Sequence, residues 1–190
     1  MTGALRCHIT DRKQFRSLDD LLECIRANDR AGVDFIQIRE KDLSARQLSQ
    51  LVQSALAVCT QARVLVNTRV DVAMACGAHG AHLPGDTPSP EVWRKLAPES
   101  FLLGVSCHSV TEAIRAERES ADYVIFAPVF NPLSKAKQRE AQGLDALREA
   151  CRAVRIPVLA LGGITDENAP LCLKAGAAGV AGITLFQRRR

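Results

Sequence analysis

Short apolar runs alternate with longer amphipathic segments along the chain, and this alternation restricts the fold more than any other feature of the sequence. Eight runs have the length and composition of strands buried on both faces, at 5–9, 35–38, 64–66, 80–83, 102–105, 123–126, 158–161 and 179–183. Seven amphipathic segments separate them, at 17–31, 44–61, 69–76, 90–96, 110–120, 144–154 and 166–175. This order predicts an α/β protein with a parallel sheet.

Two architectures satisfy the alternation, a doubly wound open sheet and a (β/α)8 TIM barrel. Three helices lead into the next strand through related phrases, AGVDFIQI, CGAHGAHL and AGAAGVAGI, in which glycine ends the helix. Such near-repetition favours the barrel, and we predict a single domain over residues 1–190. Only 184–190 follow the last predicted strand, so we expect a truncated eighth helix.

Composition excludes several classes of protein. A chain of 190 residues with 47% hydrophobic residues can bury a sizeable core. The net charge of +4 is mild and includes the three terminal arginines, so we expect no nucleic-acid partner. No apolar run reaches membrane-spanning length. Seven scattered cysteines without a CxxC pair indicate free thiols, and we expect a cytoplasmic protein with no membrane contact.

Polar residues follow most of the predicted strands, where a barrel enzyme places its chemistry. In the stretch VDFIQIREKD, the buried run is followed by Gln37, Arg39 and Lys41. One alternative is that these cations only pair with Glu40 and Asp42 in a solvated loop. The other strand ends carry polar groups too, which favours a site; these are Thr10, Asp11, Asn67, Thr68, His82, Asp86, Ser106 to Ser109, Asn131, Ser134, Lys135, Gly162 to Thr165 and Gly182 to Thr184.

The residue types at these strand ends suggest two anion sites. Arg39, Lys41 and Lys135 can surround a phosphate, since arginine offers a planar fork and lysine a point charge. Gly162 and Gly163 precede a predicted helix start, where backbone N–H groups can approach a second phosphate.

Several phrases then resemble one known family: QIREKD, LVNTRVDVAMACGAHGAHLP, GVSCHS, ADYVIFAPVF, the Ser134-Lys135 pair, and LALGGITDEN with AGAAGVAGI. They resemble the thiamine phosphate synthase and thiazole tautomerase family over nearly the whole chain. The resemblance implies a TIM barrel and one of two activities. A synthase joins hydroxymethylpyrimidine diphosphate to thiazole phosphate with Mg2+ and releases pyrophosphate. A tautomerase aromatises a thiazole carboxylate phosphate without a metal.

The resemblance also implies roles for individual residues. Positions that hold pyrimidine and pyrophosphate are Gln37, Arg39, Lys41, Asn67, Ser106, Ser134 and Lys135, and those that hold the thiazole phosphate are Gly163, Ile183 and Thr184. The predicted catalytic residues are His108, Ser106 and Lys135. His108 coincides with the catalytic histidine of the tautomerases, with a structural imidazole as the alternative. We interpret His79 and His82 as structural.

Three departures from the family pattern affect the synthase prediction. Thr68 stands where synthases usually carry aspartate, which removes one carboxylate ligand for Mg2+. Asp86 is the remaining predicted metal ligand and lies one place short of the usual acidic position. Pro132 stands where a phosphate-binding threonine is common.

We predict a synthase, because the Arg/Lys residues of the first anion site are intact. The alternatives are a metal-independent tautomerase and a barrel that binds thiazole phosphate without turnover. The expected cofactor is Mg2+, and the expected partners are small phosphate and diphosphate substrates. The truncated eighth helix should leave apolar faces of the first and seventh helices uncovered, which predicts a homodimer.

Overall fold

Eight parallel strands form a closed barrel in this computed structural model, which describes residues 3–131 and 140–187. Each strand pairs with the next along the chain, and β8 pairs with β1 to close the ring. The strands are β1 (Leu5–Ile9), β2 (Phe35–Ile38), β3 (Arg63–Asn67), β4 (Gly80–Leu83), β5 (Leu102–Cys107), β6 (Tyr123–Phe126), β7 (Val158–Ala160) and β8 (Gly179–Gly182). The predicted TIM barrel is confirmed, and the open sheet is excluded.

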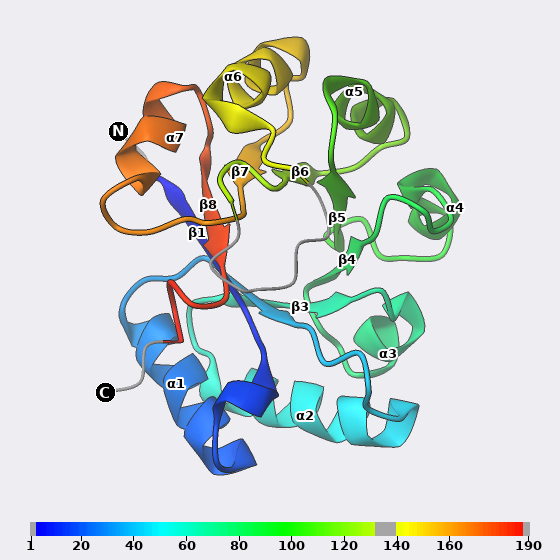
Figure 1. The fold of residues 1–190 in the computed structure, drawn as a ribbon. Helices are drawn as coiled ribbons and strands as arrows, with labels where there is room; N and C mark the ends of the chain where they lie inside the picture. The colour runs from blue at the N-terminus through cyan, green and yellow to red at the C-terminus, as the bar shows by residue number, and fades with distance from the viewer. Residues whose placement is uncertain (1–2, 132–139, 188–190) are drawn as a thin grey trace.

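Helices surround the strands as an outer ring (Figure 1). They are α1 (Leu18–Arg30), α2 (Ala45–Val58), α3 (Val70–Ala75), α4 (Pro90–Arg94), α5 (Val110–Arg118), α6 (Gly143–Ala153) and α7 (Ala169–Lys174). A short 3-10 helix, η1 (Arg12–Gln14), was not predicted from the sequence. The predicted start of α7 at residue 166 was wrong, because Thr165 and Asn168 exchange hydrogen bonds in a turn before the helix begins.

Side-chain caps explain where several helices begin. The hydroxyl groups of Ser17, Ser44 and Ser109 accept hydrogen bonds from backbone N–H groups in the first turns of α1, α2 and α5. At the other end, Gly77 and Gly176 take positive φ angles of 70° and 107°, each following the C-cap residue of α3 or α7. These predicted caps are confirmed, so local sequence chemistry sets these boundaries.

Strand residues alternate between the barrel interior and the layer under the helices. The interior cluster consists of Cys7, Ile9, Leu65, Tyr123, Ile125, Leu159 and Ala181, with Phe35 packed against it. Ile36 and Ile38 belong instead to the larger core under the helices. Because the period is two, Gln37 and Arg39 continue the interior face that Phe35 begins.

The ring of helices has a gap between α7 and α1 (Figure 1). Within the described part of the chain, only a turn follows β8, in which Phe186 N and Gln187 N donate to Ile183 O at 3.0 and 2.9 Å. A groove of about 840 Å3 lies beside this turn and α1. The expected truncation of the eighth helix is confirmed for the described residues.

A buried polar network holds this last segment against the barrel. Gln187 Oε1 accepts from Asp11 N at 2.7 Å and lies 3.2 Å from His8 Nε2. Asn28 Nδ2 donates to Phe186 O at 3.1 Å and lies 3.4 Å from His8 Nδ1. Since Gln187 Oε1 can only accept, His8 carries its proton on Nε2.

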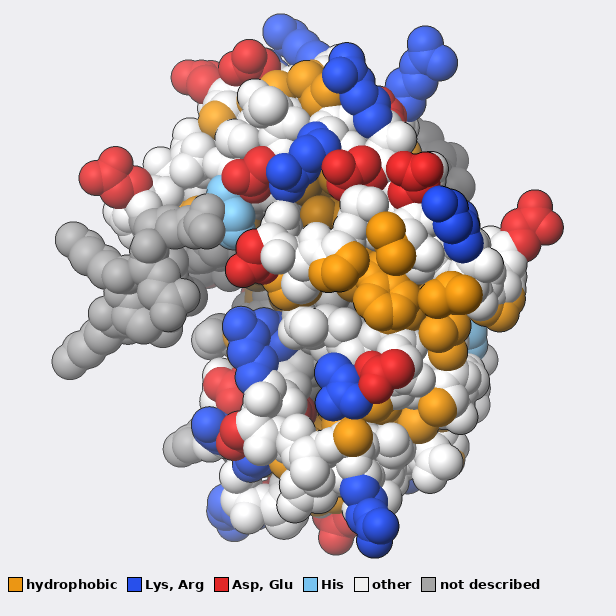
Figure 2. Space-filling model, turned by 90° about the vertical axis from the view of Figure 1, so that its right-hand side faces the viewer, with side chains coloured by type: hydrophobic (Ala, Val, Ile, Leu, Met, Phe, Trp, Pro, Cys, Tyr) orange, Lys and Arg blue, Asp and Glu red, His pale blue; other side chains and the backbone are white. Residues whose placement is uncertain are grey.

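Apolar side chains remain exposed in two places. Leu18 on α1 and Leu171 and Leu173 on α7 lie on the helices that flank the gap. Val92 and Leu96 are exposed near α4, and Figure 2 shows an apolar patch on the side of the molecule that carries α3, α4 and α5. None of the helices that the structure describes is long and apolar enough to cross a membrane.

Candidate active site

The end of β2 presents polar groups to the inside of the barrel. Gln37 is 1% exposed, and its Nε2 has no hydrogen-bond partner among the described residues. A buried amide without a partner is costly, so this donor is available for a bound molecule. Arg39 lies further toward the mouth, close enough for its charge to lower the pKa of His82.

The acidic neighbours of Arg39 and Lys41 are Glu40 and Asp42, and both contact the segment that follows β1. Glu40 Oε1 accepts from Thr10 Oγ1 at 2.7 Å and from Arg12 N at 3.0 Å. Asp42 Oδ2 lies 2.7 Å from Arg12 Nη2 and 3.2 Å from Lys13 Nζ. Burial raises the pKa of Glu40, and its hydrogen bonds from Thr10 and Arg12 oppose that shift.

These contacts bear on the alternative in which Arg39 and Lys41 pair with Glu40 and Asp42. In the structure, Glu40 and Asp42 pair with Arg12 and Lys13 instead. Within residues 3–131 and 140–187, neither Arg39 nor Lys41 forms a salt bridge. η1 therefore supplies the countercharges, and two cations remain available near the mouth of the barrel.

The ends of β3 and β4 meet beside this region. Asn67 pairs with His82 in the strand register, and Thr68 N donates to His82 O at 2.8 Å. Asn67 Nδ2 donates to Thr68 Oγ1 at 2.7 Å. Thr68 has a φ of 66°, which is strained for a β-branched residue. Such strain is typical of functional sites, where surrounding contacts hold the backbone in place.

His82 was among the polar strand-end residues but was interpreted as structural, and it contacts a predicted site residue, Ser106. It is 3% exposed, and its Nε2 lies 2.8 Å from Ser106 Oγ on the next strand. Its Nδ1 lies 3.2 Å from Tyr123 OH. Burial and then Arg39 lower the pKa of His82 to about 3, so the imidazole is neutral near pH 7. The sequence signal for this contact was the alternation of side chains along a strand, which assigns His82 to one face of β4. By contrast, His79 Nδ1 accepts from Val64 N at 3.0 Å, as expected of a structural imidazole.

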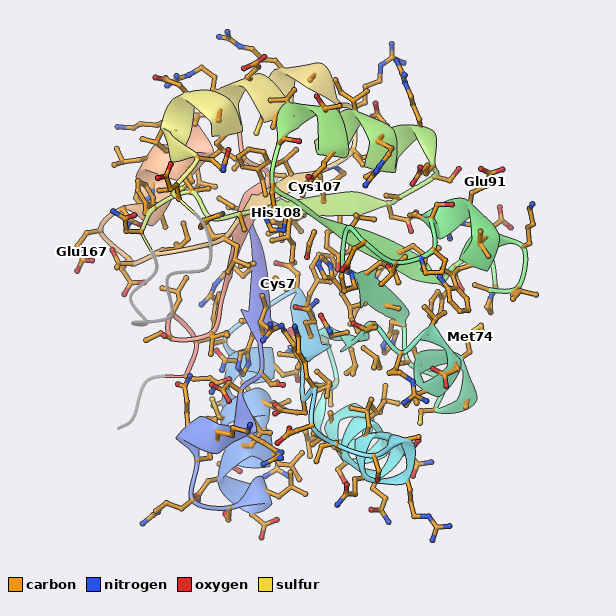
Figure 3. All side chains as sticks on the ribbon, turned by 45° about the vertical axis from the view of Figure 1, so that its right-hand side comes forward. Cys7, Met74, Glu91, Cys107, His108 and Glu167 are labelled. Carbon is orange, nitrogen blue, oxygen red and sulfur yellow. The ribbon has the colours of Figure 1, made fainter. Side chains whose placement is uncertain are left out.

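His108 follows β5 and is held by the backbone of the next strand's loop. Its Nδ1 lies 2.6 Å from Ala127 O, and because a carbonyl oxygen only accepts, Nδ1 carries a proton. Nε2 has no partner in the described part of the chain. Figure 3 shows His108 and Cys7 near the middle of the barrel, far from Glu91 and Glu167 at its periphery. The contact with Ala127 O thus fixes the ring through Nδ1 and leaves Nε2 as its other polar atom.

The glycines after β7 serve a packing role. A Cβ on Gly163 would lie 2.4 Å from Asn131 O, and one on Gly162 would lie 2.6 Å from Pro128 Cα. Both have positive φ angles, 101° at Gly162 and 62° at Gly163. The loop after β6 therefore packs directly on the loop after β7, and any side chain would separate them. Asn168 Nδ2 fixes this loop by donating to Gly163 O at 2.8 Å.

The remaining predicted residues fall into two groups. Ile183 and Thr184 follow β8, with Ile183 partly buried against the interior cluster and Thr184 exposed. Ser134 and Lys135, together with Pro132, lie outside the described residues. Asp86 is exposed in the loop after β4, and the described residues contain no group of three or more histidine, cysteine or acidic side chains that could hold a metal.

Comparison with known proteins identifies the family. The thiamine monophosphate synthase family profile matches residues 7–186. The chain is 41% identical to a thiamine-phosphate synthase of Chlorobium luteolum over 82% of this chain and 74% of that protein. It is 43% identical to one of Methanocella arvoryzae, over 80% and 73% of the two chains. A solved thiamine phosphate pyrophosphorylase from Pyrococcus furiosus has a TM-score of 0.83 and 32% identity, over 95% of this chain and 86% of that one. The predicted family and class of enzyme are confirmed: this chain belongs to the thiamine monophosphate synthase family.

Proposed function

We propose that this protein joins hydroxymethylpyrimidine diphosphate to thiazole phosphate and releases pyrophosphate. The observation that carries this proposal is the end of β2. Within residues 3–131 and 140–187, Gln37 Nε2 has no hydrogen-bond partner and Arg39 and Lys41 form no salt bridge, while Glu40 and Asp42 pair with η1. Two available cations at a barrel mouth suit a diphosphate. Membership of the family supports the same substrates.

The chemistry requires stabilisation of charge more than proton transfer. Diphosphate leaves from a benzylic-type carbon, and the electron-rich pyrimidine stabilises the resulting cation. Arg39 and Lys41 would balance the charge that develops on the leaving diphosphate. Gln37, Asn67 and Ser106 would orient the pyrimidine, and we assign Ser134 and Lys135 to the diphosphate as well.

The thiazole phosphate would bind at the mouth after β7 and β8, and β8 is separated from β2 by β1. Thr184 offers an exposed hydroxyl group, and the backbone of Gly163 is partly exposed beside the loop after β6. Ile183 continues the interior apolar cluster toward the mouth. This arrangement suits a ligand with a phosphate and an apolar ring.

The residues present fit Mg2+ only as a metal held mainly by substrate. Asp86 would supply the single carboxylate, and Asn67 and Thr68 would supply neutral oxygens from the neighbouring strand end. Mg2+ is commonly held by one or two carboxylates together with substrate phosphates. When bound, it would neutralise part of the diphosphate charge.

Arg39→Ala should weaken pyrophosphate binding roughly 10- to 100-fold, because one charge-assisted contact contributes about 1.5–3 kcal/mol. Isothermal calorimetry with pyrophosphate measures this, and Lys135→Ala should have a similar effect. Arg30→Ala is the matched control, since Arg30 is an exposed arginine at the end of α1 that precedes β2. Equal pyrophosphate affinity in Arg39→Ala and Arg30→Ala would exclude the proposed diphosphate site.

Thr68→Asp should lower the Mg2+ concentration needed for half-maximal pyrophosphate release by restoring a carboxylate ligand. Aspartate also tolerates a φ of 66° better than a β-branched residue, so stability should not fall. Arg69 will not capture the new carboxylate, because its Nη2 already lies 2.5 Å from Asp71 Oδ2. If Thr68→Asp needed the same Mg2+ concentration for half-maximal pyrophosphate release as the unmodified protein, the metal would not bind at the end of β3.

A thiazole tautomerase is the second candidate, favoured by the geometry of His108. Its Nδ1 donates to Ala127 O, which leaves Nε2 free to move a proton. Metal-independent aromatisation that disappears in His108→Ala would establish this activity, while pyrophosphate release from the two substrates establishes the synthase. Ligand binding without either turnover would indicate the third candidate, a non-catalytic barrel.

We also propose a cytoplasmic homodimer. The exposed Leu18, Leu171 and Leu173 flank the gap in the helix ring, and an apolar surface of this kind commonly forms an interface. All seven cysteines are free, as expected in a reducing compartment. Light scattering at micromolar concentration should give twice the mass of the chain, and a monomer would exclude the dimer.

A further inference from the structure

Three side chains from neighbouring strands form a hydrogen-bonded chain that leads from the barrel interior to the mouth. Tyr123 on β6 and His82 on β4 are both 3% exposed, and Ser106 is on β5, the strand between these two. Tyr123 OH lies 3.2 Å from His82 Nδ1, and His82 Nε2 lies 2.8 Å from Ser106 Oγ. The three groups are therefore connected in one line.

Gly104 makes this connection possible. In the strand register, His82 pairs with Gly104, and Gly104 pairs with Tyr123. A Cβ on Gly104 would lie 2.1 Å from Tyr123 Cζ and 2.4 Å from its hydroxyl oxygen. Only glycine leaves room for the phenol to cross β5 and reach the imidazole.

The direction of the hydrogen bonds follows from the requirement to satisfy buried donors. A neutral imidazole donates from one nitrogen and accepts at the other. If His82 donated from Nδ1, the buried proton of the Tyr123 hydroxyl would have no acceptor among the described residues. Tyr123 therefore donates to Nδ1, Nε2 carries the His82 proton, and this proton is donated to Ser106 Oγ. The proton of the Ser106 hydroxyl is left for a ligand.

Two neighbours keep this arrangement in place. Phe35 stacks on the Tyr123 ring with centroids 5.5 Å apart and an interplanar angle of 16°. Burial raises the pKa of Tyr123, which keeps the phenol protonated. Burial and then the charge of Arg39 lower the pKa of His82, so its imidazole stays neutral.

We propose that Tyr123 and His82 are positioning residues that fix Ser106 as a hydrogen-bond donor to the substrate. The inference rests on the proposed function, in which Ser106 contacts the pyrimidine. Because Ser106 donates this hydrogen bond, the substrate must supply the acceptor. The acceptor would be a ring nitrogen or an oxygen with a lone pair that faces β5. Ser106 would discriminate against a ring that presents a donor at this position.

Tyr123→Phe is the direct test, because it removes only the hydroxyl oxygen and retains the ring on Phe35. Turnover measured as pyrophosphate release should fall about tenfold, as expected for the loss of one hydrogen bond in a chain. In a Ser106→Ala background, the same Tyr123→Phe change should have no further effect. Equal effects in both backgrounds would overturn the inference. Cys7→Ala is the control, since it removes one atom from the same interior cluster and none of the atoms that form the two hydrogen bonds of the chain.

A spectroscopic readout separates this inference from the proposed function. Long-range proton–nitrogen NMR should show the His82 proton on Nε2 in the unmodified protein and a mixture of tautomers in Tyr123→Phe. His82→Gln, whose amide can still donate to Ser106, should retain more turnover than His82→Leu. If the unmodified protein released no pyrophosphate, the proposed function would fail. The tautomer of His82 would still show whether Tyr123 and His82 orient the hydroxyl group of Ser106. A His82 proton on Nδ1 in the unmodified protein would overturn the inference.

Discussion

Lowering the pH from 7 to 4.5 should reduce the free energy of unfolding by roughly 5 kcal/mol through His8 and His82 alone. Both imidazoles are buried, with exposed fractions of 0% and 3%. Burial lowers the pKa of His8 to about 4, and burial together with Arg39 lowers that of His82 to about 3. A loss of this size is comparable to the whole stability of many domains.

The sign follows from proton binding in the two states. Between the ordinary histidine pKa of 6.5 and the lowered values, the unfolded chain binds protons that the folded chain does not. Stability is therefore complete above this window and falls as the pH decreases, by up to about 1.4 kcal/mol per pH unit for each histidine. Glu40, whose pKa is raised by burial, acts in the opposite direction.

Urea unfolding at several pH values between 7.5 and 4.5 measures this slope. His8→Gln should reduce the slope to about half, whatever it does to the absolute stability, because one of the two titrating groups is gone. A flat profile between pH 6.5 and pH 5 would show that neither imidazole has a lowered pKa in the folded protein.

Asp29→Ala should destabilise the fold by roughly 3 kcal/mol, because its carboxylate accepts several hydrogen bonds at a buried position. Asp29 is 1% exposed at the end of α1. It accepts from Thr60 N and Oγ1 at 3.0 and 2.9 Å, from Gln61 N at 2.9 Å and from Ala62 N at 2.7 Å. Burial alone would raise the pKa of Asp29, but these hydrogen bonds outweigh it and lower the pKa to about 2.

The loss should appear as a lower urea midpoint with an unchanged m value. Asp29→Asn retains the shape but directs an amide donor at backbone N–H groups, so it should be destabilised to a similar degree. Asp19→Ala on the exposed face of the same helix should cost less than about 1 kcal/mol. If Asp29→Ala were as stable as Asp19→Ala, the loop before β3 would not depend on this carboxylate.

The chain's own pattern was sufficient for most of the secondary structure. Ser17, Ser44 and Ser109 cap their helices through contacts within four residues, and these contacts are present in any fold that contains the helices. The alternation that puts Gln37 and Arg39 on the same face is equally local, since a strand has a period of two. Such features are determined by neighbours in the sequence.

Contacts between distant segments depended on closure of the barrel. The sequence placed Glu40 and Asp42 beside Arg39 and Lys41, but the structure brings η1 to them from about 30 residues away. The link from Tyr123 through His82 to Ser106 likewise requires three strands in register, with Gly104 leaving the space between them.

The sequence by itself therefore determined the order of elements, their caps and the faces of the strands, because these depend on local backbone geometry. Only the tertiary structure decided which charges are neutralised and which histidine contacts Ser106. Both depend on the strand register and on the closing pair of β1 and β8, which no local pattern specifies.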